Sequence, residues 1–133
     1  MILDLDRHGG VPIYRQVMDQ VRRQILIGQL KVGEQVESVK SLSARLKINP
    51  MTVSKAYGFL VEEGLLDRRR GVGLFVRSIR KDVKRRQQDR MLERAMNKVA
   101  ALAVQMGIPE ERALRLFSDQ YREFDPPGTG DKS

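Results

Sequence analysis

Two short stretches of the chain combine side chains that can bind a polyanion and contact the edge of a nucleic-acid base. Residues 49–55 include an asparagine, a threonine, a serine and a lysine, and residues 68–70 are three consecutive arginines. Hydroxyl and amide groups hydrogen-bond phosphates and base edges, and the arginine fork fits guanine or a narrow minor groove. These stretches indicate nucleic-acid binding, provided that the surrounding elements hold them on one surface.

The first stretch is positioned by two short predicted helices. Ser38 is an N-cap acceptor for a helix over residues 38–46, whose Val39, Leu42 and Leu46 recur at helical spacing. After a turn over residues 47–50, Asn49 caps and Pro50 opens a second helix that runs to about residue 63. Its predicted buried face is Val53, Ala56, Tyr57, Leu60 and Val61. The pattern predicts a helix-turn-helix, whose second helix presents its first turns to a DNA major groove: Met51, Thr52, Ser54 and Lys55.

The second stretch falls in a predicted β-hairpin directly after these helices. Gly64 follows the helix end, residues 65–67 begin a strand, residues 68–73 form a turn with two glycines, and residues 74–76 return. The tip would carry Arg68, Arg69, Arg70 and Gly71, where arginine can enter a minor groove or bind phosphate. The order of helices and hairpin predicts a winged helix-turn-helix in residues 1–77.

The positive charge of the chain is concentrated next to this hairpin. The net charge is +8 and the isoelectric point about 10.2, and residues 68–90 contain eight arginines, two lysines and two aspartates. This span carries the whole excess, which indicates a polyanion-binding face, whether nucleic acid or an anionic membrane. Residues 77–90 contain only Ile79 and Val83 as large apolar residues, which argues against membrane insertion. A non-specific nucleoid-type protein remains an alternative to a sequence-specific regulator.

The composition gives little support for catalysis, metal binding or a cofactor. The chain has no cysteine, and its single histidine, His8, lies in a polar segment that we expect to be an exposed loop. Neither a Gly-rich phosphate loop nor an evident acid pair is present, so we expect no enzyme, no metal and no cofactor. The absence of a long apolar run or a signal-peptide pattern favours a cytoplasmic protein without membrane contact.

The remaining segments are predicted to be mostly helical. Residues 1–11 could include a short extended piece, and a helix opening at Pro12 would end near Gly28 and Gly33. One long helix is expected over residues 78–105 and another from Pro109 to about residue 124, while residues 125–133 are expected to be disordered. The fold class is therefore mainly α with a small β-hairpin: a winged helix-turn-helix followed by a helical dimerisation segment.

The two C-terminal helices, over residues 78–124, have too little apolar surface to form a core alone. A second copy in an isologous two-fold dimer would cover them, and packing against the chain's own DNA-binding domain is the alternative. A two-fold dimer predicts a pseudopalindromic operator with half-sites ~10 bp apart or a multiple of that. The expected dimerisation residues are Leu92, Ala95, Met96, Val99, Leu102, Ala103, Met106, Leu114, Phe117 and Tyr121.

A set of short blocks occurs in a fixed order within residues 11–77: residues 12–17, 28–33, 46, 52–53, 56–57, 60, 63–66 and 70–76. By these blocks the chain resembles the GntR family of bacterial transcription regulators. Residues 49–53 and the short two-helix tail are similar to the YtrA subfamily. The resemblance implies a dimeric, repressor-like DNA-binding protein, often tied to transporter operons. The positions that it implies for DNA contact are Lys40, Asn49, Met51, Thr52, Ser54, Arg70 and Gly71, to which the side-chain chemistry adds Ser38, Lys55, Arg68 and Arg69.

Two departures from the family pattern bear on affinity. The family commonly has Pro-Ser-x-Arg where this chain has Glu37, Ser38, Val39 and Lys40. Lysine lacks the bidentate fork, and Glu37 adds a negative charge near the phosphates, so both changes should weaken specific binding. Arg68, Arg69 and the basic start of the long helix would compensate through non-specific charge.

A small-molecule effector is not specified by the sequence. Residues 78–124 are too few to enclose a drug-sized cavity within one chain, since such cavities need ~300 Å³ or more. A site between two protomers, lined by Met91, Met96 and Met106, is compatible with the pattern, although methionines at helical spacing usually belong to a core.

Overall fold

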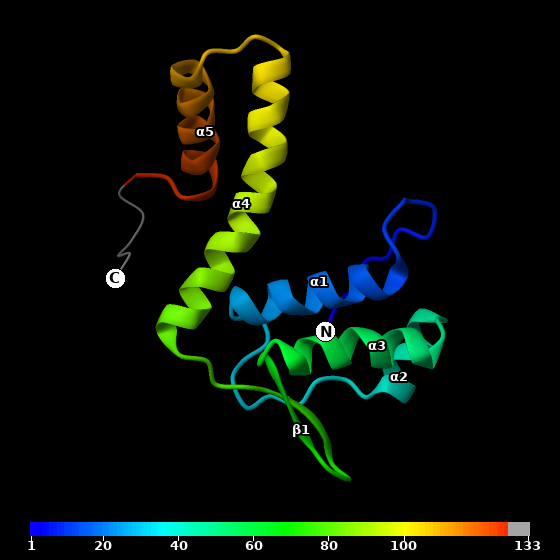
Figure 1. Cartoon of the computed structure of the whole chain (residues 1–133). Helices are drawn as coiled ribbons and strands as arrows, with labels where there is room; N and C mark the ends of the chain where they lie inside the picture. The colour runs from blue at the N-terminus through cyan, green and yellow to red at the C-terminus, as the bar shows by residue number, and fades with distance from the viewer. Residues whose placement is uncertain (128–133) are drawn as a thin grey trace. The chain divides into compact units, whose positions relative to one another are not determined.

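The computed structural model describes residues 1–127, and the chain divides into two compact units, Met1–Gln88 and a second that begins at Asp89. The elements in order are α1 (Ile13–Leu26), α2 (Val39–Leu46), α3 (Pro50–Glu62), β1 (Leu66–Arg69), β2 (Gly73–Val76), α4 (Lys81–Gln105) and α5 (Glu110–Phe124) (Figure 1). The predicted fold class, mainly α with a small β-hairpin and a C-terminal helical segment, is confirmed. None of the helices in residues 1–127 is both long and apolar enough to cross a membrane.

The core of the first unit forms where the apolar stripe of α1 packs against α3. Val17 and Val21 of α1 and Val53 and Leu60 of α3 are completely buried, and the burial of the two α3 residues agrees with the prediction from their spacing. Burying a side chain of this size stabilises the fold by about 1.5–3 kcal/mol. Gly28 ends the helix with a left-handed φ of 84°. The packing of α1 on α3 is therefore one major source of the stability of this unit.

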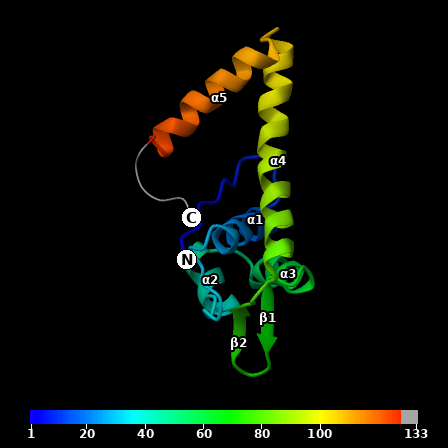
Figure 2. The ribbon, with the colours of Figure 1, turned by 90° about the vertical axis from the view of Figure 1, so that its left-hand side faces the viewer.

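The hairpin is longer than the sequence indicated. β1 and β2 pair antiparallel from Leu66 opposite Val76 to Arg69 opposite Gly73, so the turn is only residues 70–72 (Figure 2). The prediction that Arg68 and Arg69 lie in the turn is therefore wrong. The guanidinium of Arg69 lies 4.1 Å from the centre of the Phe75 ring, and this cation–π contact across the two strands supports their pairing near the tip.

The segment over residues 33–36 covers the free edge of β2. The amides of Gly33 and Val36 donate to the carbonyls of Val76 and Leu74, and the Val76 amide donates to Glu34, at 2.8–2.9 Å. Gln35 also forms an isolated antiparallel β-bridge with Phe75. Covering the edge satisfies backbone groups that would otherwise be exposed, and it secures the hairpin to the helices.

The N-terminal segment contains no strand, although an extended piece was expected. Its partners are instead side-chain amides from a row of glutamines on α1, spaced four residues apart and therefore on one helix face. Leu3 is buried in the core beneath this row. Gln16 pairs with both backbone groups of Asp6, Gln20 with both of Asp4, and Gln24 with the carbonyl of Ile2, at 2.6–2.8 Å.

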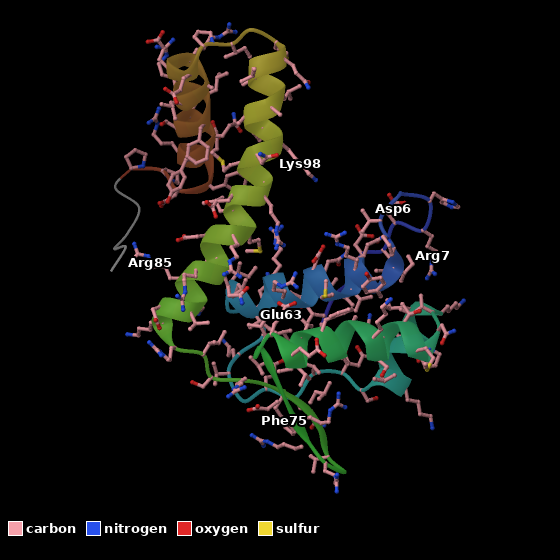
Figure 3. All side chains as sticks on the ribbon, in the orientation of Figure 1. Asp6, Arg7, Glu63, Phe75, Arg85 and Lys98 are labelled. Atoms are coloured by element: carbon pink, nitrogen blue, oxygen red, sulfur yellow. The ribbon has the colours of Figure 1, made fainter. Side chains whose placement is uncertain are left out.

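A buried arginine ties α1 to the end of α3. The Arg22 side chain donates to both carboxylate oxygens of Glu63, at 2.9 and 2.6 Å, and to Asp19 at 2.7 Å. Glu63 lies between the two helices in Figure 3. Burial alone would lower the pKa of Arg22, but the hydrogen bonds and charges of Glu63 and Asp19 outweigh it, so the pKa is raised. The ion pair fixes the ends of two helices that are far apart in sequence.

The C-terminal helices differ slightly from their predicted bounds. The long helix begins at Lys81 rather than residue 78, because the Arg77 amide still donates to Leu65 and Ile79 still packs on the core. Pro109 precedes α5 as its N-cap residue. No residue of α4 or α5 is buried. Of the expected disordered tail over residues 125–133, residues 128–133 lie outside the described part of the chain.

Candidate nucleic-acid interface

The caps that position the two short helices form as predicted. The Ser41 amide donates to the Ser38 hydroxyl at 3.0 Å, and the Met51 amide donates to the Asn49 carboxamide oxygen at 2.8 Å. Each cap uses one acceptor lone pair. The Ser38 O–H and the Asn49 NH₂ therefore keep donors that a phosphate oxygen could accept.

The turn between these helices depends on a left-handed residue that the sequence pattern did not reveal. Lys47 has φ 56° and ψ 49°, and the Ile48 amide donates to the Ser43 carbonyl at 3.0 Å. A non-glycine residue in this conformation costs about 1 kcal/mol or more. The buried Leu42 and Val53 on either side compensate for it and fix the angle at which α3 leaves the turn.

The first two turns of α3 present a polar face to solvent. Met51 is 75% exposed, Ser54 and Lys55 are exposed, and Thr52 is half-buried, while Val53 is completely buried. These four outer residues line a shallow cleft of about 620 Å³ that is closed on its other side by Pro12, Ile13 and Tyr14 of the α1 start. Sequence reasoning did not include these α1 residues in the site.

Lys55 is oriented by an aromatic pair rather than free in solvent. Its ammonium lies 4.0 Å from the centre of the Tyr14 ring, and that ring stacks on Phe59 with 5.9 Å between centroids. A cation over an aromatic face gains about 0.5–1 kcal/mol at an exposed site. The pair therefore holds Lys55 on the α1 side of the recognition face.

The predicted negative charge of Glu37 is neutralised within the protein. Its carboxylate accepts hydrogen bonds from Arg45, at 2.7 Å, and from the Ser41 hydroxyl, also at 2.7 Å. The Arg45 hydrogen bond lowers the pKa of Glu37. Its backbone carbonyl accepts from the buried Tyr57 hydroxyl at 2.7 Å, and burial raises the pKa of Tyr57. The isolated charge that we expected near the phosphates is thus an ion pair, whereas Lys40 is exposed and outside any ion pair in the described residues.

The hairpin and the start of α2 enclose a second cleft, of about 430 Å³. It brings Ser38 together with Arg68, Arg69, Arg70 and Gly71, five of the predicted site residues. Gln35, which sequence reasoning did not include, donates to the Val72 carbonyl at 2.9 Å and so braces the tip. Gly71 has a left-handed φ of 75°, which allows the tight turn.

The predicted residues therefore fall mainly into two groups on the first unit. One is the outer face of α3, and the other is the cleft beside the hairpin; Lys40 and Asn49 line neither cleft. No grouping of three or more metal-ligand side chains occurs in residues 1–127. Two groups of polar and cationic side chains on a helix and a hairpin suit a duplex, whose groove and backbone lie side by side.

This arrangement defines a winged helix-turn-helix DNA-binding protein. Residues 13–76 match the sequence model of a family described as bacterial regulatory proteins, gntR family. The chain thus carries the helix-turn-helix domain of the GntR family, as the resemblance of residues 11–77 implied.

Known transcription regulators are similar to this chain over different shares of its length. The transcriptional repressor YtrA of Bacillus subtilis is 36% identical over 75 residues, which are 56% of this chain and 58% of the relative. A GntR family transcriptional regulator from Listeria monocytogenes has the same fold, with a TM-score of 0.75 at 23% identity, over 86% of this chain and 98% of the other. The AraR DNA-binding domain, solved in complex with operator ORX1, has a TM-score of 0.51 at 28% identity, over 56% of this chain and 95% of the other. The chain spans less than two thirds of the length of the curated relatives that it matches first.

Proposed function

We propose that this chain is a sequence-specific transcription repressor that binds a pseudopalindromic operator as a homodimer in the cytoplasm, without catalytic activity of its own. The observation that carries the proposal is the capped α3, whose Met51 and Ser54 are exposed, in the same compact unit as a hairpin with an arginine tip. The relatives named above support it, since YtrA is a repressor and the AraR domain was solved with its operator.

In this proposal, one set of residues contacts the bases and determines specificity, and another contacts the phosphates and contributes most of the affinity. The exposed side chains of α3, Met51, Thr52 and Ser54, contact base edges in the major groove. The backbone phosphates accept hydrogen bonds from the free donors of the capping residues, Ser38 and Asn49. They also pair with cationic side chains: Lys40, Lys55, Arg68, Arg69 and Arg70. Gly71 allows the phosphate backbone to approach the hairpin closely. Pairing of Glu37 with Arg45 supports this division, because a neutralised carboxylate repels phosphate less than a free one.

The homodimer is supported by the apolar side chains of the C-terminal helices. Leu92, Val99, Leu102, Met106 and Leu114 are each 53–58% exposed, and Phe117 and Tyr121 lie beside one another with ring centres 6.0 Å apart. Transferring the exposed half of a leucine out of water would contribute about 1 kcal/mol. Ala95 and Ala103 are small enough to let a second helix approach closely, and Met96 completes the set.

Genomic binding selection with the purified protein tests the function directly. We expect one inverted repeat to be enriched and to survive an excess of non-specific competitor DNA. Recovery of no motif, with all binding lost to competitor, would replace the proposal with the non-specific nucleoid-type alternative.

A pair of matched variants then tests the role of α3 on the selected repeat. Ser54→Ala should weaken operator binding by about 1 kcal/mol, or roughly fivefold, because it removes one base-edge hydroxyl. Ser118→Ala makes the same chemical change on exposed α5 and should leave binding unchanged. Equal effects of the two variants would show that α3 does not contact the bases.

A further inference from the structure

A cavity of about 300 Å³ lies on the side of the first unit formed by the end of α1, the loop after it and the first turn of α4. Its base is apolar: Ile25, Leu30 and Val76 are 3–5% exposed, and Ile79 is half-buried against the same core. Neither group of the proposed DNA interface lines it. The volume reaches the lower limit of cavities that hold small molecules, about 300 Å³.

The rim of this cavity is cationic. Lys31, Arg77, Lys81 and Lys84 line it, and no carboxylate does so among the described residues. Arg77 has a distant partner in Asp67, at 3.7 Å, whereas the three lysines form no ion pair within residues 1–127. Lys84 is half-buried, as expected for a lysine whose stem covers apolar surface while its ammonium stays in contact with water.

The end of α1, which forms one wall, presents few free acceptors to an incoming anion. Helix C-termini normally expose unpaired carbonyls, which repel negative charge. Here the amides of Ile27, Gly28 and Leu30 donate to the last-turn carbonyls, and Gln88 of α4 donates to the Leu26 carbonyl at 2.9 Å. Gly28 adds open space, since a Cβ built there would meet no atom within 4 Å.

We propose that this cavity binds a small amphipathic anion, with one carboxylate on an apolar body. The body would cover Ile25, Leu30 and Val76, and the carboxylate would accept hydrogen bonds from the lysine rim. A neutral ligand would leave the cations without a partner, and a polyphosphate would leave the apolar base in contact with water. A DNA backbone could contact the lysines but could not fill the base.

The test uses 2-naphthoate as the probe and does not depend on operator binding, so its outcome is separate from that of the proposed repressor function. Titration calorimetry and ¹H–¹⁵N NMR should show saturable binding, with shifts at the amides of Gly28, Lys31 and Ile79. The matched neutral probe, 2-naphthalenemethanol, should bind several-fold more weakly. No saturation up to about 10 mM, shifts confined to the hairpin tip, or equal affinity for both probes would overturn the proposal.

Charge-removal variants separate the rim from the general positive charge of the chain. Lys31→Gln combined with Lys84→Gln should weaken naphthoate binding by about three- to tenfold, as expected for two exposed ion pairs, and leave the neutral probe unaffected. Arg94→Gln combined with Lys98→Gln removes the same charge from α4 outside the cavity and should change neither. Equal losses of naphthoate affinity in both double variants would overturn the proposal. Chemical-shift changes at the same three amides on addition of a DNA duplex would also overturn it, because they would assign the rim to DNA binding.

Discussion

Replacing Arg22 with methionine is expected to destabilise the first unit by about 2 kcal/mol. The change removes three charge-assisted hydrogen bonds, each worth about 1.5–3 kcal/mol when buried. That sum is an upper bound, because the side chains of Glu63 and Asp19 keep 30% and 48% of their exposure and regain water when the arginine is replaced. Methionine also preserves part of the packing of the stem.

Urea unfolding at a fixed protomer concentration measures this destabilisation, and thermal unfolding should show a midpoint lower by roughly 10 °C. A double-mutant cycle with Glu63→Gln should give a coupling energy of about 1–2 kcal/mol. Arg112→Met, an exposed change on α5, should cost less than about 0.5 kcal/mol. An effect of Arg22→Met no larger than that of this control, or a coupling near zero, would refute the view that the ion pair secures α1 to α3.

Three further outcomes are expected. Gel-shift titrations at several salt concentrations give the slope of the logarithm of the DNA-binding constant against the logarithm of the salt concentration. Arg70→Ala should make this slope shallower by about 0.9 for each phosphate that the variant no longer neutralises. A wild-type slope equivalent to only two neutralised phosphates would contradict a highly charged interface. Because the folded-state pKa of Glu37 is lowered, its carboxylate stabilises the fold above the ordinary glutamate pKa, and this contribution disappears as the pH falls through the lowered value. Urea unfolding of Glu37→Gln should therefore show a destabilisation of about 0.5–1 kcal/mol at pH 7, discounted for the 44% exposure of Arg45, and this difference from the wild type should shrink as the pH is lowered into the acidic range. The exposed control Glu62→Gln should change the stability little at pH 7. Leu102→Glu should turn dimers into monomers in sedimentation velocity, whereas Ala101→Glu, with the same charge one residue away, should not; dimers in both would place the interface elsewhere.

The parts of the fold that depend on local sequence could be predicted. The caps at Ser38 and Asn49, the buried face of α3 and the glycine at the end of α1 follow from neighbouring residues, and each forms as expected. The outward face of α3 follows from the same helical period. The winged arrangement could be inferred because the elements that form it are consecutive in the chain.

The parts of the fold that depend on partners distant in the sequence could not be predicted. Arg22 and Glu63 are 41 residues apart, and an arginine beside an apolar stripe is ordinarily solvated. The pairing of Gln35 with Phe75 and the placement of Lys55 over Tyr14 likewise need the tertiary fold. The prediction ended the first strand too early because it assigned Arg68 and Arg69 to the turn. The contact of Arg69 with the Phe75 ring, which favours the strand, forms only when the two strands are paired.

The glutamine row on α1 has a consequence for the exchange of backbone hydrogens with solvent deuterium. The amide hydrogens of Asp4 and Asp6 are bonded to glutamine oxygens, so they should exchange slowly and become unprotected only when the segment detaches from the helix. The alternate amides of Leu3 and Leu5 have no such acceptor on the glutamines and should exchange faster. An odd–even pattern of this kind normally marks an edge strand, and here it would arise from a helix that offers its side chains in place of a neighbouring strand.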